Sequence, residues 1–274
     1  MSALRPAALA FDAIAAAFDE RFGAWNSVSA QRRAVRSALL LAFPERGRIL
    51  EIGGGTGEDA MFLAQRGLEV FLTDPSPAMV SVAEKKLRPL GGKAALAAAE
   101  EMESFAEEHF ATDGPLFDGC FSNFAPLNCV ADLQPLAGSL ARLLKPGAPA
   151  LLVFFGTFCP GEMITEVLRG RPGLALRRCW RGEAPARVAG REFRVVYHRR
   201  ADLIRAFSPW FTLEGRLGIG VTVPPSAAEP WISRHPHLLA AMESLDHLLA
   251  RPLAVLGDHV LYRFRRTGAP SPAR

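Results

Sequence analysis

A cluster of glycines is the first feature of this chain that could do chemistry. Gly53, Gly54, Gly55 and Gly57 follow directly on the apolar stretch 48–52, and a helical pattern of apolar residues begins at Ala60. Glycine accepts a positive φ and lets a ligand approach the backbone without meeting a Cβ. The first N–H groups of a helix favour electron-rich ligand atoms. The pattern therefore predicts a buried strand, a sharp turn and a helix that together bind a ligand.

An acidic residue at the end of the next apolar run supports this interpretation. Asp74 closes the run 70–73 and lies about 20 residues after the glycines, where a carboxylate can accept hydrogen bonds from both hydroxyls of a ribose. A turn or helix-cap role before Pro75 is the alternative, and the two roles are compatible. The spacing is GxGxG; a dinucleotide fingerprint would need glycine where Glu58 stands, and the Lys-Ser/Thr ending of a P-loop is missing.

The stretches EIGGGTG at 51–57 and LTDPSPAMVSVAEKK at 72–86 resemble motif I and its successor in class I S-adenosylmethionine-dependent methyltransferases, of the small-molecule "methyltransferase type 11" kind. The resemblance continues through LFDGCFSN at 116–123, similar to the fourth strand of that family, and through LLKPG at 143–147, followed by a fifth apolar run. These motifs occur in order and at the family spacing over about residues 48 to 156. The combination is more specific than any one motif.

The resemblance implies an α/β fold with a doubly wound, seven-stranded, mostly parallel sheet of the Rossmann-like kind, N-terminal helices and an inserted lid. Apolar runs place strands at 48–53, 69–74, 94–99, 117–123 and 149–155, then at 191–198, 211–223 and 259–264. Helices are expected at 3–17, 29–43 and 237–249. The expected parts are an N-terminal helical lid (1–47), a cofactor-binding core (48–156), an inserted lid or substrate region (157–207), strands and a helix that complete the core (208–267) and a disordered tail (268–274).

The same resemblance implies S-adenosylmethionine as cofactor and S-adenosylhomocysteine as product. The cofactor-binding residues that it implies are Glu51, Gly53, Gly54, Gly55, Gly57, Asp74, Pro75, Met79, Ala99, Glu100, Glu101 and Asn123. At the adenine the chain departs from the family, because Ala98 or Ala99 stands where an aspartate is usual. The adenine contact is then left to backbone N–H groups or to Glu100 or Glu101, which could equally be solvated charges that open a helix.

The acceptor side rests on aromatic residues near the N-terminus. Phe18 and Phe22 recur at helical spacing, which is typical of core packing, and Trp25 follows. Helices in this position lie over the cofactor in the resembling family, so all three are also candidates for substrate binding. Asn128 is a fourth candidate, since its loop follows the fourth strand and should border the methyl group. That loop lacks the Asn-Pro-Pro-Tyr/Phe pattern, which argues against a DNA adenine or protein glutamine acceptor.

The catalytic residue is left unknown. Methyl transfer to a neutral amine, thiolate, phenolate or carboxylate needs little beyond positioning, whereas an alcohol or carbon acid needs a base. His198 and Glu162 are weak candidates, and His235, His237 and His259 are not distinguished from His198 by spacing. For each of them a structural role is the competing interpretation.

The segment 157–207 is rich in arginine, and two interpretations stay open. It could be a basic lid that recruits an anionic acceptor, because guanidinium groups pair with phosphate and carboxylate. It could instead be a solvated surface in a chain whose basic residues are mostly arginine, and this is the preferred interpretation. RNA binding is a third, weaker one, because few aromatic residues interleave with the arginines and the net charge is only +4.

Composition bounds the remaining classes. The four cysteines form no CxxC motif, so neither a metal site nor a disulfide framework is expected, and a reducing cytoplasm is the default location. Apolar runs stop well short of the roughly 20 residues of a membrane span, and no signal-peptide order is evident. We therefore expect an enzyme acting on an anionic, aromatic or lipid-like small molecule, with nucleic acid disfavoured and the oligomeric state open. The alternatives are an RNA methyltransferase, a nucleotide-dependent oxidoreductase and a non-catalytic binding partner.

Overall fold

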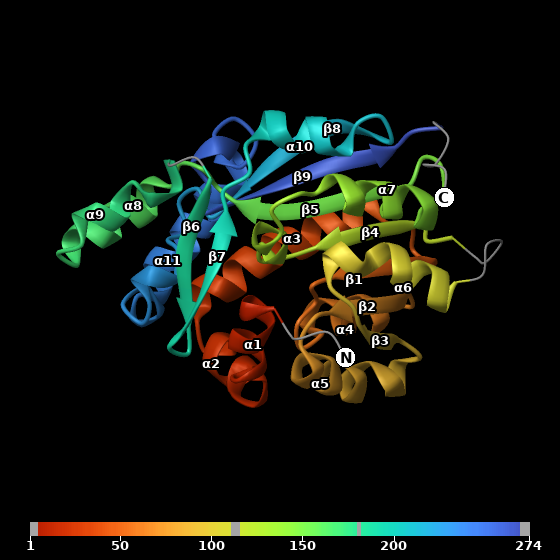
Figure 1. The fold of residues 1–274 in the computed structure, drawn as a ribbon. Coiled ribbons are helices and arrows are strands. Elements are labelled where there is room, and N and C mark those ends of the chain that lie inside the picture. Colours follow the sequence, from red (N-terminus) through yellow and green to blue (C-terminus); the bar gives the residue numbers. More distant parts are fainter. Residues whose placement is uncertain (1–4, 111–115, 180–181, 269–274) are drawn as a thin grey trace.

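A seven-stranded sheet forms the centre of the computed structural model, which describes residues 5–110, 116–179 and 182–268 (Figure 1). Its strands lie in the order β3-β2-β1-β4-β5-β9-β8. Their bounds are β1 (Arg48–Ile52), β2 (Glu69–Asp74), β3 (Lys93–Leu96), β4 (Gly119–Ser122), β5 (Pro149–Phe155), β8 (Phe211–Ile219) and β9 (His259–Arg266). Strands β1 to β5 are parallel, and β9 runs antiparallel to both β5 and β8. The expected α/β fold is confirmed.

Helices cover both faces of this sheet. One face carries α3 (Asn26–Ala42), α4 (Glu58–Ala64) and α5 (Pro77–Leu87), and the other carries α6 (Met102–His109), α7 (Gln134–Leu143) and α10 (Arg200–Phe207). Side chains alternate along each strand. In β1, Ile49 therefore packs toward α3 to α5, while Leu50 packs toward α6, α7 and α10. The strands are apolar on both sides because both sides are buried.

The N-terminal helices differ from the expectation in their bounds. The single helix expected at 3–17 is divided into α1 (Pro6–Asp12), the 3-10 turn η1 (Ala15–Ala17) and α2 (Phe18–Gly23). Helix α3 begins at Asn26, three residues before the expected start. The reason is a cap supplied from far along the chain, because the Glu229 carboxylate accepts the backbone N–H and the hydroxyl of Ser27.

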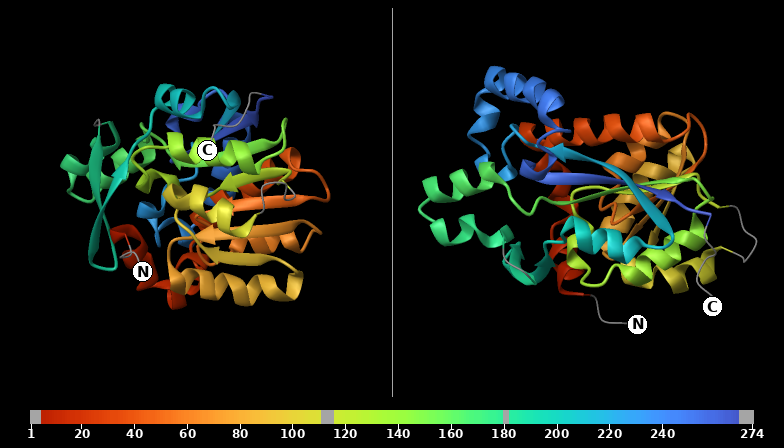
Figure 2. Two further views of the ribbon diagram at one scale, coloured as in Figure 1. Left: turned by 45° about the vertical axis from the view of Figure 1, so that its right-hand side comes forward. Right: turned by 90° about the horizontal axis from the view of Figure 1, so that it is seen from above.

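The segment after β5 extends away from the sheet (Figure 2). It contains α8 (Pro160–Leu168), α9 (Pro172–Ala175), the turn η5 (Arg177–Cys179) and a hairpin of β6 (Glu183–Val188) with β7 (Arg191–Val196). The strand expected at 191–198 is present, but it pairs with β6, which the sequence did not predict. Phe193, Val195 and Tyr197 of this segment pack with Ala10 of α1. The hairpin therefore holds the N-terminal helices from one side.

The remaining boundaries differ by a few residues. Strand β3 stops at Leu96: the Ala97 N–H still bonds the Asp74 carbonyl of β2, and the chain then enters the 3-10 helix η3 (Ala99–Glu101). Helix α11 (Pro236–Leu249) and the two last strands lie where they were expected. Within the described ranges, none of the helices has the length and apolar character to cross a bilayer. Of the expected tail at 268–274, residues 269–274 lie outside those ranges.

Candidate active site

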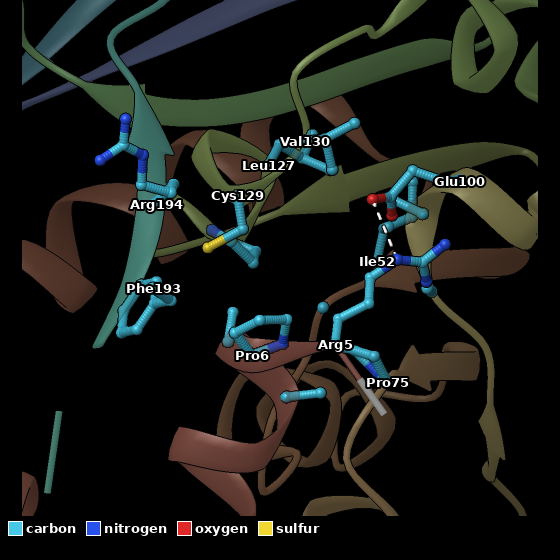
Figure 3. A pocket seen from close by; sticks show the side chains of 16 residues that line it. Arg5, Pro6, Ile52, Pro75, Glu100, Leu127, Cys129, Val130, Phe193 and Arg194 are labelled. Atoms are coloured by element: carbon cyan, nitrogen blue, oxygen red, sulfur yellow. Dashed lines mark ion pairs between the residues drawn. The ribbon is translucent and has the colours of Figure 1, made fainter. Parts of the chain in front are cut away.

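A cavity of about 240 Å³ opens where β1, β2, β3 and β4 end (Figure 3). Its floor is formed by Ile52 at the end of β1 and Gly53 after it, Pro75 after β2, Ala98 to Glu100 after β3, and the 3-10 helix η4 (Pro126–Cys129) after β4. Residues 5–8, at and before the start of α1, and Phe193 and Arg194 of β7 close the cavity from outside. Ligands of open α/β sheets bind beyond the carboxyl ends of the strands, and this cavity has that position.

The glycine loop lies against the cavity in a conformation that excludes side chains. Gly53 has φ +66°, and a Cβ on it would lie 2.6 Å from the Pro126 side chain. Gly55 has φ +55° and faces open space, with no atom within 4 Å of a Cβ built there. Gly57, also at positive φ, is the residue before helix α4. Of the four predicted glycines, Gly53 thus brings bare backbone to the cavity, and Gly54 and Gly57 pack against Leu72 of β2.

Asp74 joins this loop to the turn after β2. One carboxylate oxygen accepts the N–H of Gly55 and the other accepts the N–H of Ser76, both at 2.9 Å. Burial raises the pKa of Asp74 to about 6, and the two backbone N–H groups oppose that rise. Two more of the predicted residues follow Asp74. Pro75 lines the cavity, and Met79 is buried in the first turn of α5, where its N–H donates to the hydroxyl oxygen of Ser76.

Glu51 has a carboxylate oxygen that lacks a partner. The side chain is 2% exposed, and no hydrogen bond reaches its Oε2 from the residues that the structure describes. Burial, together with the nearby charges of Asp59 and Asp74, raises the pKa of Glu51 well above its usual range. A buried acceptor beside two other carboxylates is costly unless a donor pairs with it. A cationic hydrogen-bond donor, such as the ammonium group of S-adenosylmethionine, fits that requirement.

Asn123 follows directly on β4, and both the nitrogen and the oxygen of its side-chain amide are hydrogen-bonded. The Nδ2 group donates to Asp59 at 2.7 Å, and Oδ1 accepts the N–H of Phe124 at 2.8 Å. Phe124 and Ala125 then have φ of 58° and 62°, the left-handed region that residues with a Cβ seldom occupy. Such strained backbone clusters at functional sites, where the surrounding structure holds it.

The two glutamates left open for the adenine contact have different positions. The carboxylate of Glu101 turns back to accept the N–H of Ala98, so it closes the turn η3. Glu100 and Ala99 line the cavity, and Glu100 pairs with Arg5 at 3.3 Å (Figure 3). Of the two side chains, only that of Glu100 therefore faces the cavity where an adenine would lie.

The N-terminal helices are tied to the cavity edge by two aspartates. Asp12, at the end of α1, accepts the hydroxyl of Ser76 at 2.7 Å and the N–H of Ala78 at 2.9 Å. Asp19, in α2, contacts the hydroxyl of Thr56 and the ammonium of Lys86. In the sequence both aspartates look like ordinary polar positions of an amphipathic helix. Their spacing does not indicate which residues they contact, and neither aspartate was predicted as a site residue.

The candidate acceptor residues Phe18, Phe22 and Trp25 form one row of rings. The ring centroids of Phe18 and Phe22 are 4.6 Å apart, and those of Phe22 and Trp25 are 4.9 Å apart. Phe11 connects the row to Phe193 of β7. The rings are half-buried, and none of the three lines the cavity of Figure 3.

Three other candidates are engaged in structural contacts. Asn128 donates to the Val196 carbonyl and accepts the N–H of Phe155, so it joins β7 to β5. The ring of His198 bonds through Nε2 to the Val130 carbonyl at 2.9 Å, and burial lowers the pKa of His198.

Glu162 is the third of these candidates. It accepts hydrogen bonds from Arg177 and Arg178. Burial opposes its ionisation, but the two guanidinium groups prevail and lower the pKa of Glu162. It is an ionised and neutralised carboxylate, not a free base.

Residues 50–150 match the family model described as "Methyltransferase domain". The chain is 32% identical over 154 residues to the biotin biosynthesis bifunctional protein BioHC of Cellvibrio japonicus, which covers 55% of this chain and 28% of that protein. It is 31% identical over 116 residues to the tRNA 5-carboxymethoxyuridine methyltransferase of Escherichia coli, which covers 41% of each. The chain thus matches less than half the length of these curated relatives.

Solved structures resemble the whole fold at low identity. The methyltransferase in complex with the Trm112 activator of Haloferax volcanii has a TM-score of 0.60 at 16% identity, over 98% of this chain and 99% of that one. The DhpI complex with S-adenosylhomocysteine has a TM-score of 0.54 at 15% identity, over 98% and 100%. The methyl donor of this fold class is S-adenosylmethionine. The chain carries a methyltransferase domain, and its fold is that of the class I S-adenosylmethionine-dependent methyltransferases.

Proposed function

We propose that this chain is an enzyme that transfers the methyl group of S-adenosylmethionine to a small-molecule acceptor. One observation carries the proposal: the partnerless, buried Oε2 of Glu51 lies beside the glycine loop and Asp74, where a cationic ligand would satisfy it. The matched methyltransferase domain covers these same positions. S-adenosylmethionine supplies an activated methyl group. The protein therefore has to bind and orient the two substrates and to exclude water.

The roles of the binding residues follow from their contacts. The carboxylate of Asp74 would accept the ribose hydroxyls while the N–H groups of Gly55 and Ser76 hold it in place. Glu51 would pair with the ammonium of the methionine part. Glu100 would accept a hydrogen bond from the amino group of the adenine. Pro75 and Leu127 would supply apolar walls for the adenine ring.

A small acceptor is favoured over a nucleic acid by the charges of the inserted segment. Five of the described arginines there pair with carboxylates of the same segment: Arg171 with Glu166, Arg177 and Arg178 with Glu162, Arg194 with Glu183, and Arg205 with Asp202. Paired guanidinium groups neutralise few phosphates. We therefore propose that the N-terminal lid and the 157–207 segment select a small acceptor, in keeping with the preferred interpretation of the arginines as surface charge.

Calorimetry with S-adenosylmethionine and S-adenosylhomocysteine tests the cofactor assignment, with Glu51→Gln as the variant that keeps the size of the side chain. We expect the wild type to bind both ligands and the variant to bind both more weakly. The glutamine amide keeps the shape of the Glu51 side chain but cannot carry its negative charge. A screen with tritium-labelled methyl donor follows, with phenols, carboxylates, amines and bulk tRNA as acceptors. Absence of cofactor binding would refute the proposal, and transfer to tRNA alone would replace the small-molecule assignment.

A further inference from the structure

A histidine that the cofactor site does not use lies at the acceptor side of the sheet. His259 is the first residue of β9 and pairs with Phe155, the last residue of β5. Its ring stacks on Phe155 at 5.1 Å and meets the edge of Phe124 at 5.8 Å. Phe124 belongs to the strained turn after β4, next to Asn123. The ring is thus held at the carboxyl edge of the sheet, against the end of β5 and the turn after β4 that is expected to border the methyl group.

The two nitrogens of this ring have different surroundings. Nδ1 lies 3.4 Å from the carboxylate of Asp258, which is buried and also bound by Arg178 and Gln31. No hydrogen bond to Nε2 is made by any side chain or carbonyl in the described ranges. A carboxylate at Nδ1 keeps the proton on that nitrogen and leaves a lone pair on Nε2. It also stabilises the imidazolium that forms when Nε2 takes up a proton.

The other five histidines do not offer this arrangement. His198 and His235 each bond a backbone carbonyl, of Val130 and Trp231, and so does His109 on α6. His237 and His247 are exposed on α11. Among the six histidines, His259 alone has a carboxylate on one nitrogen and a free second nitrogen in the described structure.

We propose that His259 is the general base of the methyl transfer, and that the acceptor is a molecule whose reacting group is a weakly acidic hydroxyl. This inference rests on the proposed function. The proton of the acceptor hydroxyl passes to Nε2 while the acceptor oxygen forms a bond to the methyl carbon. The bond between that carbon and sulfur breaks, and its electron pair stays on the sulfur. The product sulfur is then a neutral thioether, and the imidazolium returns its proton to water. Asp258 acts as a positioning residue.

Other charged groups near the ring are already neutralised. The guanidinium of Arg178 lies over Phe155 and is paired with Glu162 and Asp258. The guanidinium of Arg32 lies over Phe124 and is paired with Asp59. The buried Asp258 carboxylate has its pKa lowered despite burial, by the His259 and Arg178 charges, so it stays ionised.

A series of phenols of graded acidity, from 4-methylphenol to 4-nitrophenol, tests the proposal. The variant is His259→Asn, whose amide can still bond Asp258 but has no atom at the Nε2 position; His237→Asn is the control. We expect His259→Asn to lower kcat about 100-fold or more with the least acidic phenol, in line with the usual contribution of a general base. The loss should shrink to less than about tenfold for 4-nitrophenol, which ionises without help. Both variants should bind S-adenosylmethionine like the wild type.

The rate–pH profile separates a catalytic role from a structural one and needs no variant. In the wild type, the rate should decrease toward low pH with the same midpoint for every phenol, because the group that is protonated belongs to the enzyme. In His259→Asn, the midpoint of this decrease should change with the acidity of each phenol. The proposal would be overturned if His259→Asn lowered kcat equally with all phenols. It would also be overturned if the midpoint of the wild-type pH profile already changed with the acidity of the phenol. Cofactor binding with transfer only to amines or carboxylates would overturn it and leave the proposed function intact, whereas no cofactor binding would remove both.

Discussion

The carboxylate of Asp19 lies 2.5 Å from the hydroxyl of Thr56, so helix α2 is bonded to the middle of the glycine loop. The same carboxylate lies 2.5 Å from the ammonium of Lys86 on α5. Asp12 makes the equivalent connection from α1 to the turn that follows Asp74. Both connections end on segments that the proposed cofactor touches. We propose that the N-terminal helices are a closed cover over the proposed cofactor site.

Removing these two connections should make cofactor exchange faster. In a Asp12→Ala, Asp19→Ala double variant we expect the dissociation rate of S-adenosylhomocysteine to rise at least about tenfold, equivalent to about 1.4 kcal/mol. The reason is that the cover loses its charge-assisted hydrogen bonds. Stopped-flow tryptophan fluorescence measures the rate. Asp202→Ala, which removes an exposed carboxylate from α10, is the control, and equal rates in both variants would contradict the cover.

Asp74→Ala should weaken S-adenosylmethionine binding by about 1.5–3 kcal/mol, the scale of lost hydrogen bonds to a charged group. Calorimetry on the folded variant measures it. Unchanged affinity would mean that the ribose is held by other groups.

Cofactor affinity should also depend on pH through Asp74. Because its pKa in the folded protein is raised to about 6, the carboxylate is largely protonated below that pH and accepts fewer hydrogen bonds. Affinity should be complete above pH 6 and fall as the pH drops through about 6. Asp74→Asn, which does not titrate, should show weaker binding without this fall. A wild-type affinity that stays constant between pH 5 and pH 7, to either side of that value, would contradict the assignment.

Glu100 and Glu101 should differ in their effect on the adenine. Glu100→Ala should lower the preference for S-adenosylhomocysteine over its inosine analogue about three- to tenfold, the scale of one hydrogen bond. Glu101→Ala should leave that preference unchanged and lower thermal stability, because Glu101 caps the turn at Ala98. Competition calorimetry with the two ligands measures the preference, and equal effects of the two variants would refute the distinction.

Phe18→Ala or Trp25→Ala should lower kcat or raise the KM of the acceptor. Cofactor affinity should stay within about threefold, below 1 kcal/mol, because neither ring lines the cofactor cavity. Leu41→Ala, on the exposed side of α3, is the control. Loss of cofactor binding with unchanged acceptor kinetics would instead assign the rings to the cofactor pocket or to the core.

The strands of the core could be predicted because each is a short apolar run between turn-forming residues. β5, with seven residues of which six are buried, is the clearest case. Boundaries were less accurate where the apolar pattern runs past the end of an element. Residues 97–99 continue the apolar pattern of β3, but the chain enters η3 there, and the Glu101 carboxylate accepts the N–H of Ala98.

The binding residues of the proposed site were predictable only where a motif carries them. Asp74 and the glycines stand in sequence order and could be identified, whereas Asp12, Asp19 and the His259–Asp258 pair act through partners far along the chain. Glu229 shows the same limit, because it caps a helix that begins more than two hundred positions earlier. Local periodicity contains no information about such partners.

The position of β9 has a consequence for how the protein is made. The last strand in sequence is inserted between β5 and β8, with hydrogen bonds to both. Until it has left the ribosome, both neighbours present an unpaired strand edge, which is a template for aggregation. A nonsense mutation before residue 259 would leave these edges open permanently. The sheet that carries the methyltransferase domain is therefore completed only after β9 has been synthesised.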